Sequence, residues 1–160
     1  MKTIYTFLLA CILSPIALVA QQDMDDIDFF KALFGVDKLT IVEDFISVPE
    51  AKSDAFWTTY KAYETARKAL RSERITILRD YADNYENLSE EQIEDLCKRS
   101  LKQNKKNTKN IEKYFKKLKK AGGITAAAQF LQIEKYFLSL STTAIYENLP
   151  FLGELERIDD

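Results

Sequence analysis

Hydrophobic residues recur every three or four positions over long stretches of this chain, whereas the strict alternation typical of a β-strand is rare. Glycine and proline, which interrupt helices, are sparse after residue 20. The pattern therefore predicts an all-α fold. We expect a long antiparallel helical hairpin with a third packed helix and short N-terminal helices.

The first long helix is predicted from about Val48 to about Tyr85. Ser47, followed three residues later by Glu50, is typical of a capping box, and Pro49 fits the first turn because the N–H that it lacks would be unpaired there. The helix then carries "AFWTTYKAYE", with four aromatic residues at helical spacing. We expect these rings to pack in the core, and an exposed aromatic patch for a partner is the alternative.

The stretch "LSEEQI" predicts the start of the second long helix. Ser89 is placed as the N-cap, Gln92 closes a capping box, and Leu88 and Ile93 form a hydrophobic staple. The helix is expected to end at the glycines of "AGG", residues 121–123, which permit a left-handed C-terminal turn. A tight turn near residue 87 would make the two helices antiparallel.

The third helix is predicted from about Thr125 to about Asn148 and should pack into the hairpin, because apolar residues cover more than half of its circumference. Glu134 lies within its apolar stripe, and a buried carboxylate requires a partner. The expected partners are the arginines on the inner line of the first long helix. An ion pair of structural importance is the first interpretation, and a ligand site is the alternative. These arginines are Arg67, Arg71 and Arg74.

The first twenty residues combine one lysine with an apolar run that Ser14 and Pro15 interrupt, which is typical of a secretory signal peptide. Cleavage after Ala20 is expected, and a lipoprotein cleavage before Cys11 is the alternative. The mature chain, residues 21–160, is the size of one helical domain, and the leader predicts a periplasmic location.

We expect a short helix that ends at Gly35, while residues 36–46 fit either a helix or an extended segment.

Composition excludes several kinds of chemistry. The chain has no histidine, so Ser-His-Asp and Cys-His catalysis and histidine metal sites are absent. No catalytic, cofactor-binding or metal-binding residues are predicted from any motif. After removal of the leader, Cys97 is the single cysteine, so an internal disulfide is excluded. We expect Cys97 to be a small buried residue, with a reactive thiol or an intermolecular bridge as alternatives.

Residues 98–120 contain eleven Lys and Arg against one acid, Glu112, in a chain whose formal net charge is −2. One interpretation is a solvated helix face that acidic segments balance; the other is a surface for acidic protein segments or anionic lipid. Nucleic acid is not expected as a partner. The residues proposed to bind a partner are Lys102, Lys105, Lys106, Lys109, Lys113, Lys116 and Lys117. The inner line of this helix is predicted at Cys97, Leu101, Asn104, Thr108, Ile111, Phe115 and Leu118, a heptad spacing.

"LSEEQ" at residues 88–92 resembles the LTxxQ motif of the Spy/CpxP-like periplasmic stress proteins, with Ser89 in place of threonine. The wider pattern also resembles a group of uncharacterised exported helical proteins of Gram-negative bacteria. The resemblance implies a small all-helical protein that acts as an ATP-independent chaperone or envelope-stress modulator, often as an antiparallel dimer. A second LTxxQ motif is missing, because "ITAAAQ" at residues 124–129 is one residue too long, and without histidine the metal sensing of some relatives is not carried over.

Two functions are therefore expected, and neither is enzymatic. The first is binding of unfolded or envelope proteins, as a chaperone or stress modulator, with a homodimer as an open alternative. The second is a structural or adaptor role in the cell envelope, in which the basic helix contacts an anionic membrane or a partner. No cofactor is expected for either function.

Overall fold

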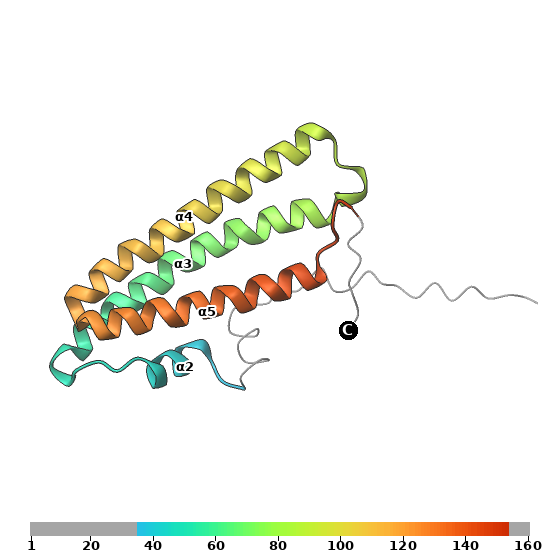
Figure 1. Cartoon of the computed structure of the whole chain (residues 1–160). Helices are drawn as coiled ribbons and strands as arrows, with labels where there is room; N and C mark the ends of the chain where they lie inside the picture. The colour runs from blue at the N-terminus through green and yellow to red at the C-terminus, as the bar shows by residue number, and fades with distance from the viewer. Residues whose placement is uncertain (1–34, 154–160) are drawn as a thin grey trace, which may run out of the picture. The chain divides into compact units, whose positions relative to one another are not determined.

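The computed structural model of the protein describes residues 35–153 and is all-α over that range, as predicted (Figure 1). The signal peptide and most of the short helix expected before Gly35 lie outside the described residues. The helices are α2 (Lys38–Phe45), α3 (Ser53–Ala82), α4 (Glu90–Gly122) and α5 (Ile124–Asn148), with single 3₁₀ turns at Glu50–Lys52 and Tyr85–Asn87. The residues that fitted either a helix or an extended segment thus form α2.

The chain divides into two compact units, Met1–Lys38 and Leu39–Asp160. Helices α3, α4 and α5, which carry the features discussed below, all belong to the second unit. A single domain over residues 21–160 stays a prediction.

The predicted hairpin is formed by α3 and α4, which a short connection around Tyr85–Asn87 joins (Figure 1). The capping box that starts α4 is confirmed. The Gln92 backbone N–H donates to Ser89 Oγ at 3.3 Å, and the Ser89 N–H donates to Gln92 Oε1 at 2.8 Å. Leu88 and Ile93 are both half-buried, and the staple between them stays a prediction.

The turn between α4 and α5 consists of two glycines, of which Gly122 is closely packed. Gly123 has φ of +99°, a conformation that favours glycine, and its N–H donates to the Lys119 carbonyl at the end of α4. Gly122 lies against the Phe56 ring of α3, and a Cβ added there would be 2.5 Å from Phe56 Cδ2. The chain therefore reverses directly into α5, which packs on the hairpin as predicted (Figure 1).

Aromatic residues of α3 form much of the core. Phe56, Tyr60 and Tyr63 are fully buried, and the Tyr63 ring packs edge-on against Phe130 of α5 and Tyr114 of α4, with ring centroids 4.9 and 5.5 Å apart. Such arrangements suit the ring quadrupoles. Three of the four rings of "AFWTTYKAYE" therefore pack in the core, and the alternative of an exposed patch is wrong for these three residues, whereas Trp57 is half-buried.

The capping box expected at Ser47 and Glu50 is wrong, and the first long helix begins at Ser53 after a 3₁₀ turn. The Gln129 side chain of α5 binds the Ser47 backbone in place of the Glu50 side chain. Its Oε1 accepts from the Ser47 N–H at 3.0 Å, and its Nε2 donates to the Phe45 carbonyl at 3.1 Å. The backbone donor that Glu50 would have capped is thus already paired.

The inner line predicted for α4 is also wrong over most of the helix. Cys97, Leu101, Asn104 and Thr108 are exposed, and Leu101 is 70% exposed. A different line of α4 faces the other helices. Gln103 lies on this line and is buried, and its Nε2 donates to the Leu70 carbonyl of α3 at 3.0 Å. The buried and half-buried residues on this line are Leu96, Arg99, Gln103, Asn107, Asn110, Tyr114 and Leu118.

Candidate functional site

Four of the seven lysines proposed to bind a partner share one exposed face of α4. Lys102, Lys105, Lys109 and Lys116 are spaced by three, four and seven residues, which places them on one side of a helix. We call these four residues the lysine ridge. They extend over about 21 Å, given a rise of 1.5 Å per residue. The ridge faces away from the line of α4 that packs against the other helices.

The other three lysines have partners of their own. The Lys106 ammonium forms an ion pair with Glu73 of α3 at 2.6 Å. Lys113 and Lys117 lie over the Tyr114 ring, with their ammonium nitrogens 5.4 and 5.0 Å from its centroid. These three side chains thus help to hold α4 in place or to cover a core ring, and they are less available for a partner.

Acidic residues balance the basic charge of α4 only at some places. Arg99 donates to Asp80 of α3 at 2.6 Å, and Lys98 pairs with Glu94 at 2.6 Å. Hydrogen bonding to Asp80 raises the pKa of Arg99 further above its usual range. Within residues 35–153, no acidic side chain lies within ion-pair distance of the lysine ridge. The interpretation of a face balanced by acids therefore fits the flanks of the helix and not the ridge.

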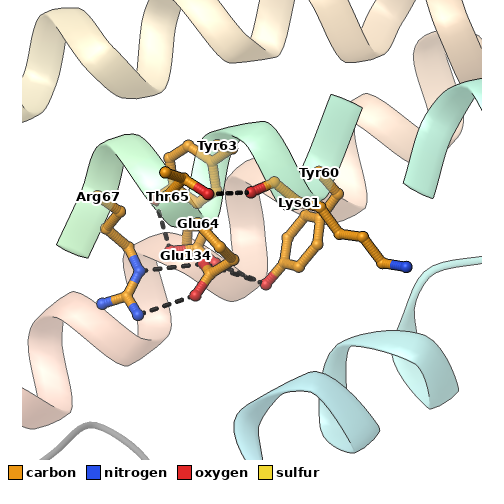
Figure 2. Close-up of polar contacts among 7 residues, drawn as sticks. All are labelled: Tyr60, Lys61, Tyr63, Glu64, Thr65, Arg67 and Glu134. Atoms are coloured by element: carbon orange, nitrogen blue, oxygen red, sulfur yellow. Dashed lines mark hydrogen bonds and ion pairs between the residues drawn. The ribbon is translucent and has the colours of Figure 1, made fainter. Parts of the chain in front are cut away.

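Glu134 is buried at the centre of a cluster of polar side chains between α3 and α5, as Figure 2 shows. The Tyr63 hydroxyl donates to Glu134 Oε2 at 2.7 Å, and the Tyr60 hydroxyl lies 3.5 Å from Glu134 Oε1. Glu64 is bound by Arg67 through Nε at 3.0 Å and Nη2 at 2.9 Å. Tyrosine hydroxyls, which were not predicted as partners, thus hold the buried carboxylate.

Both tyrosines are kept in their neutral form. Burial raises the pKa of Tyr60 and Tyr63 far above the usual value, the negative charge of Glu134 raises it further, and Arg67 opposes the shift. A neutral hydroxyl is the form that can donate to a carboxylate. The cluster therefore has the chemistry of a hydrogen-bonded core.

The three arginines expected near Glu134 occupy different places. Arg67 belongs to the same cluster, where it holds Glu64. Arg71 is half-buried on α3. Arg74 is not a partner of Glu134, because its Nη2 donates to Thr142 Oγ1 at 3.2 Å, about two turns farther along α5. The prediction of a Glu134 pair with Arg74 is wrong, while the expected polar contact between α3 and α5 is present in another form.

Several other features are relevant to function. Cys97 is exposed, so the expectation of a buried thiol is wrong. In the part of the chain that the structure describes, no three Cys, Asp or Glu residues lie close enough to hold a metal ion. None of the helices described there is long and apolar enough to span a membrane.

The chain was compared with protein-family models, with curated proteins and with solved structures, and no match was found in any of the three.

Proposed function

We propose that the protein is a non-enzymatic exported protein that binds other proteins through the lysine ridge. The observation that carries this proposal is the row of four exposed lysines, Lys102, Lys105, Lys109 and Lys116, which have no acidic partner within residues 35–153. A row of like charges on a packed helix repels itself, and an acidic ligand relieves that repulsion. Exposed acidic segments of unfolded or envelope proteins are the expected partners.

The resemblance to the Spy/CpxP-like proteins supports a more specific role. Through that resemblance we propose an ATP-independent periplasmic chaperone or an envelope-stress modulator, with a homodimer as an open alternative. The matching letters of the motif also have a structural explanation, because Ser89 and Gln92 form the capping box of α4. The motif is thus direct support for the hairpin and only indirect support for the chaperone role.

An aggregation assay tests the proposal. The mature protein should suppress aggregation of an unfolded, acidic client at a near-stoichiometric ratio, and added salt should weaken the effect because it screens surface charge. A variant with the four ridge lysines replaced by glutamine should lose most of the suppression.

A matched control replaces four exposed lysines elsewhere by glutamine and so removes the same charge. These are Lys52, Lys61, Lys68 and Lys135. Retained suppression in this control, together with its loss in the ridge variant, supports the proposal. Equal loss in the two variants would show that only net charge matters, and an absence of suppression at every ratio would rule out the chaperone role.

A second candidate function is that of an envelope adaptor, favoured by the straight course of the ridge over about 21 Å. A line of lysines of that length can contact several anionic lipid headgroups at once. Co-sedimentation with vesicles that contain anionic lipid, lost in the ridge variant and absent with neutral vesicles, would support this function over client binding.

A further inference from the structure

Polar side chains of α3 contact α5 at two levels and the segment just after α5 at a third. Tyr63 donates to Glu134 at 2.7 Å, Arg74 to Thr142 at 3.2 Å, and the Tyr81 hydroxyl to the Pro150 carbonyl at 2.7 Å. From one level to the next, the residue numbers of the donor and of the acceptor both increase, so α3 and α5 run parallel. The middle level differs from the other two because its donor carries a full charge and its acceptor is neutral.

The charge of Arg74 has no counter-charge among the residues that the structure describes. Within residues 35–153, Arg74 has no carboxylate within ion-pair distance, and its one hydrogen bond is to Thr142 Oγ1. By contrast, Arg67 is held by Glu64 and Arg99 by Asp80. Arg74 is half-buried, and burial lowers its pKa, but a guanidinium keeps its proton in proteins. A half-buried, uncompensated charge is costly, and an anion at this position would remove that cost.

Two hydroxyl groups of α5 accompany Arg74. The Thr142 oxygen accepts from Arg74, and the hydroxyl hydrogen of Thr142 has no acceptor among the described residues, so it remains able to donate. Tyr146 follows four residues later on the same side of α5 and is 55% exposed. Thr142 and Tyr146 thus share the side of α5 that Arg74 contacts.

We propose that Arg74, Thr142 and Tyr146 form a binding site for a single carboxylate. The planar guanidinium fork matches the two oxygens of a carboxylate, and one positive charge balances one negative charge. The Thr142 hydroxyl supplies a further donor. The site lies on α3 and α5, whereas the lysine ridge lies on α4, so the carboxylate site does not depend on the proposed function.

The test is an NMR titration of the mature protein with sodium acetate, in which sodium chloride keeps the ionic strength constant. The Nε–Hε signal of Arg74, assigned by its loss in Arg74→Gln, should shift along a saturating curve. Thr142→Val keeps the shape of the side chain and removes the hydroxyl, so the acetate affinity should fall by roughly tenfold, as expected for one hydrogen bond to a charged group. Lys68→Gln, which removes an exposed charge from the same helix, should leave the curve unchanged.

A second arm identifies the source of the carboxylate. A short neutral peptide with a free C-terminus is compared with the same peptide amidated at its end. Tighter saturation by the free peptide than by acetate would assign the site to a polypeptide end, and equal affinity would assign it to small organic acids. A linear response of the Arg74 signal to acetate, or an acetate curve that Thr142→Val leaves unchanged, would overturn the proposal.

Discussion

At the scale of single residues, the pair of Tyr63 and Glu134 shows how the core tolerates a charge. Glu134 is 4% exposed, and its closest partner in the described contacts is a hydroxyl that burial keeps protonated. Removal of one member of such a pair leaves the other buried with fewer partners, which costs more than the hydrogen bond itself contributes. The stability of the protein should therefore be sensitive to this contact.

We predict that Tyr63→Phe lowers the free energy of unfolding by about 1–3 kcal/mol at neutral pH. Chemical denaturation monitored by circular dichroism measures this change. Tyr136→Phe, which changes a tyrosine that is 51% exposed, is the control and should leave the stability unchanged. A loss of the same size in both variants would contradict the role of the Glu134 contact.

The same tyrosines make stability depend on alkaline pH. The pKa of both tyrosines is raised in the folded state. Below pH about 10 the folded and the unfolded chain both keep the hydroxyl protons, so the free energy of unfolding does not depend on these groups there. Above that pH the unfolded chain loses protons that the folded chain retains, and the free energy of unfolding falls as pH rises. Tyr63→Phe should make this decline shallower. An equal slope in the variant would show that Tyr63 does not contribute.

At the scale of elements, the start of α4 depends on a local cap. Ser89→Ala removes the acceptor of the Gln92 N–H and should lower the free energy of unfolding by about 1 kcal/mol. Ser100→Ala, at an exposed position within the same helix, is the control and should change stability little or raise it slightly, because alanine favours helix. Denaturant midpoints of the two variants measure the difference, and a Ser89→Ala midpoint equal to that of the native protein would contradict the cap.

The turn between α4 and α5 depends on close packing in place of a side-chain cap. Gly122→Ala places a methyl group 2.5 Å from the Phe56 ring, so the ring or a helix must move. We predict a loss of about 1–3 kcal/mol, the usual cost of overfilling a core. Gly153→Ala, where nothing lies within 4 Å of the added carbon, is the control. Thermal unfolding measures both variants, and an unchanged melting temperature for Gly122→Ala would show that the Phe56 ring or a helix end can move without cost.

The elements themselves could be predicted from the sequence, whereas the faces that they bury could be predicted only in part. The hairpin follows from helical spacing and the cap at Ser89, and the end of α4 follows from the glycines at residues 122 and 123. The inner line of α4 could not be found, because a search for apolar residues selects Leu101, while the structure buries Gln103, which a partner carbonyl satisfies. Leu96, Asn107 and Leu118 lie eleven residues apart on this line, a period closer to that of a straight helix than the heptad.

The candidate site was predictable in part for a similar reason. The charge pattern of the sequence was enough to locate the basic segment. To distinguish the lysine ridge from Lys106, which pairs with Glu73, one must know which side of α4 is buried. The partners of Glu134 and Arg74 depend on the register between α3 and α5. Side chains far apart in sequence meet there, and no local pattern specifies which of them do so.

At the scale of the whole molecule, charge is distributed unevenly along the sequence. The lysine ridge belongs to the middle of the chain, while two short segments, residues 23–28 and 154–160, are dense in acidic residues. The acids of these segments are Asp23, Asp25, Asp26, Asp28, Glu154, Glu156, Asp159 and Asp160. Net charge affects binding of a polyanion at long range, whatever the positions of these segments.

We predict that replacement of the four N-terminal aspartates by asparagine strengthens the binding of polyglutamate to the mature protein at low salt. The change removes four negative charges and so makes the net charge positive, which favours an acidic ligand. At physiological ionic strength the gain should largely disappear, because charges more than about 8 Å apart are then screened. Fluorescence anisotropy of labelled polyglutamate, measured at both salt concentrations, tests this. A gain that persists at physiological salt would point instead to the acidic segment competing directly for the lysine ridge, and no gain at low salt would contradict a long-range effect.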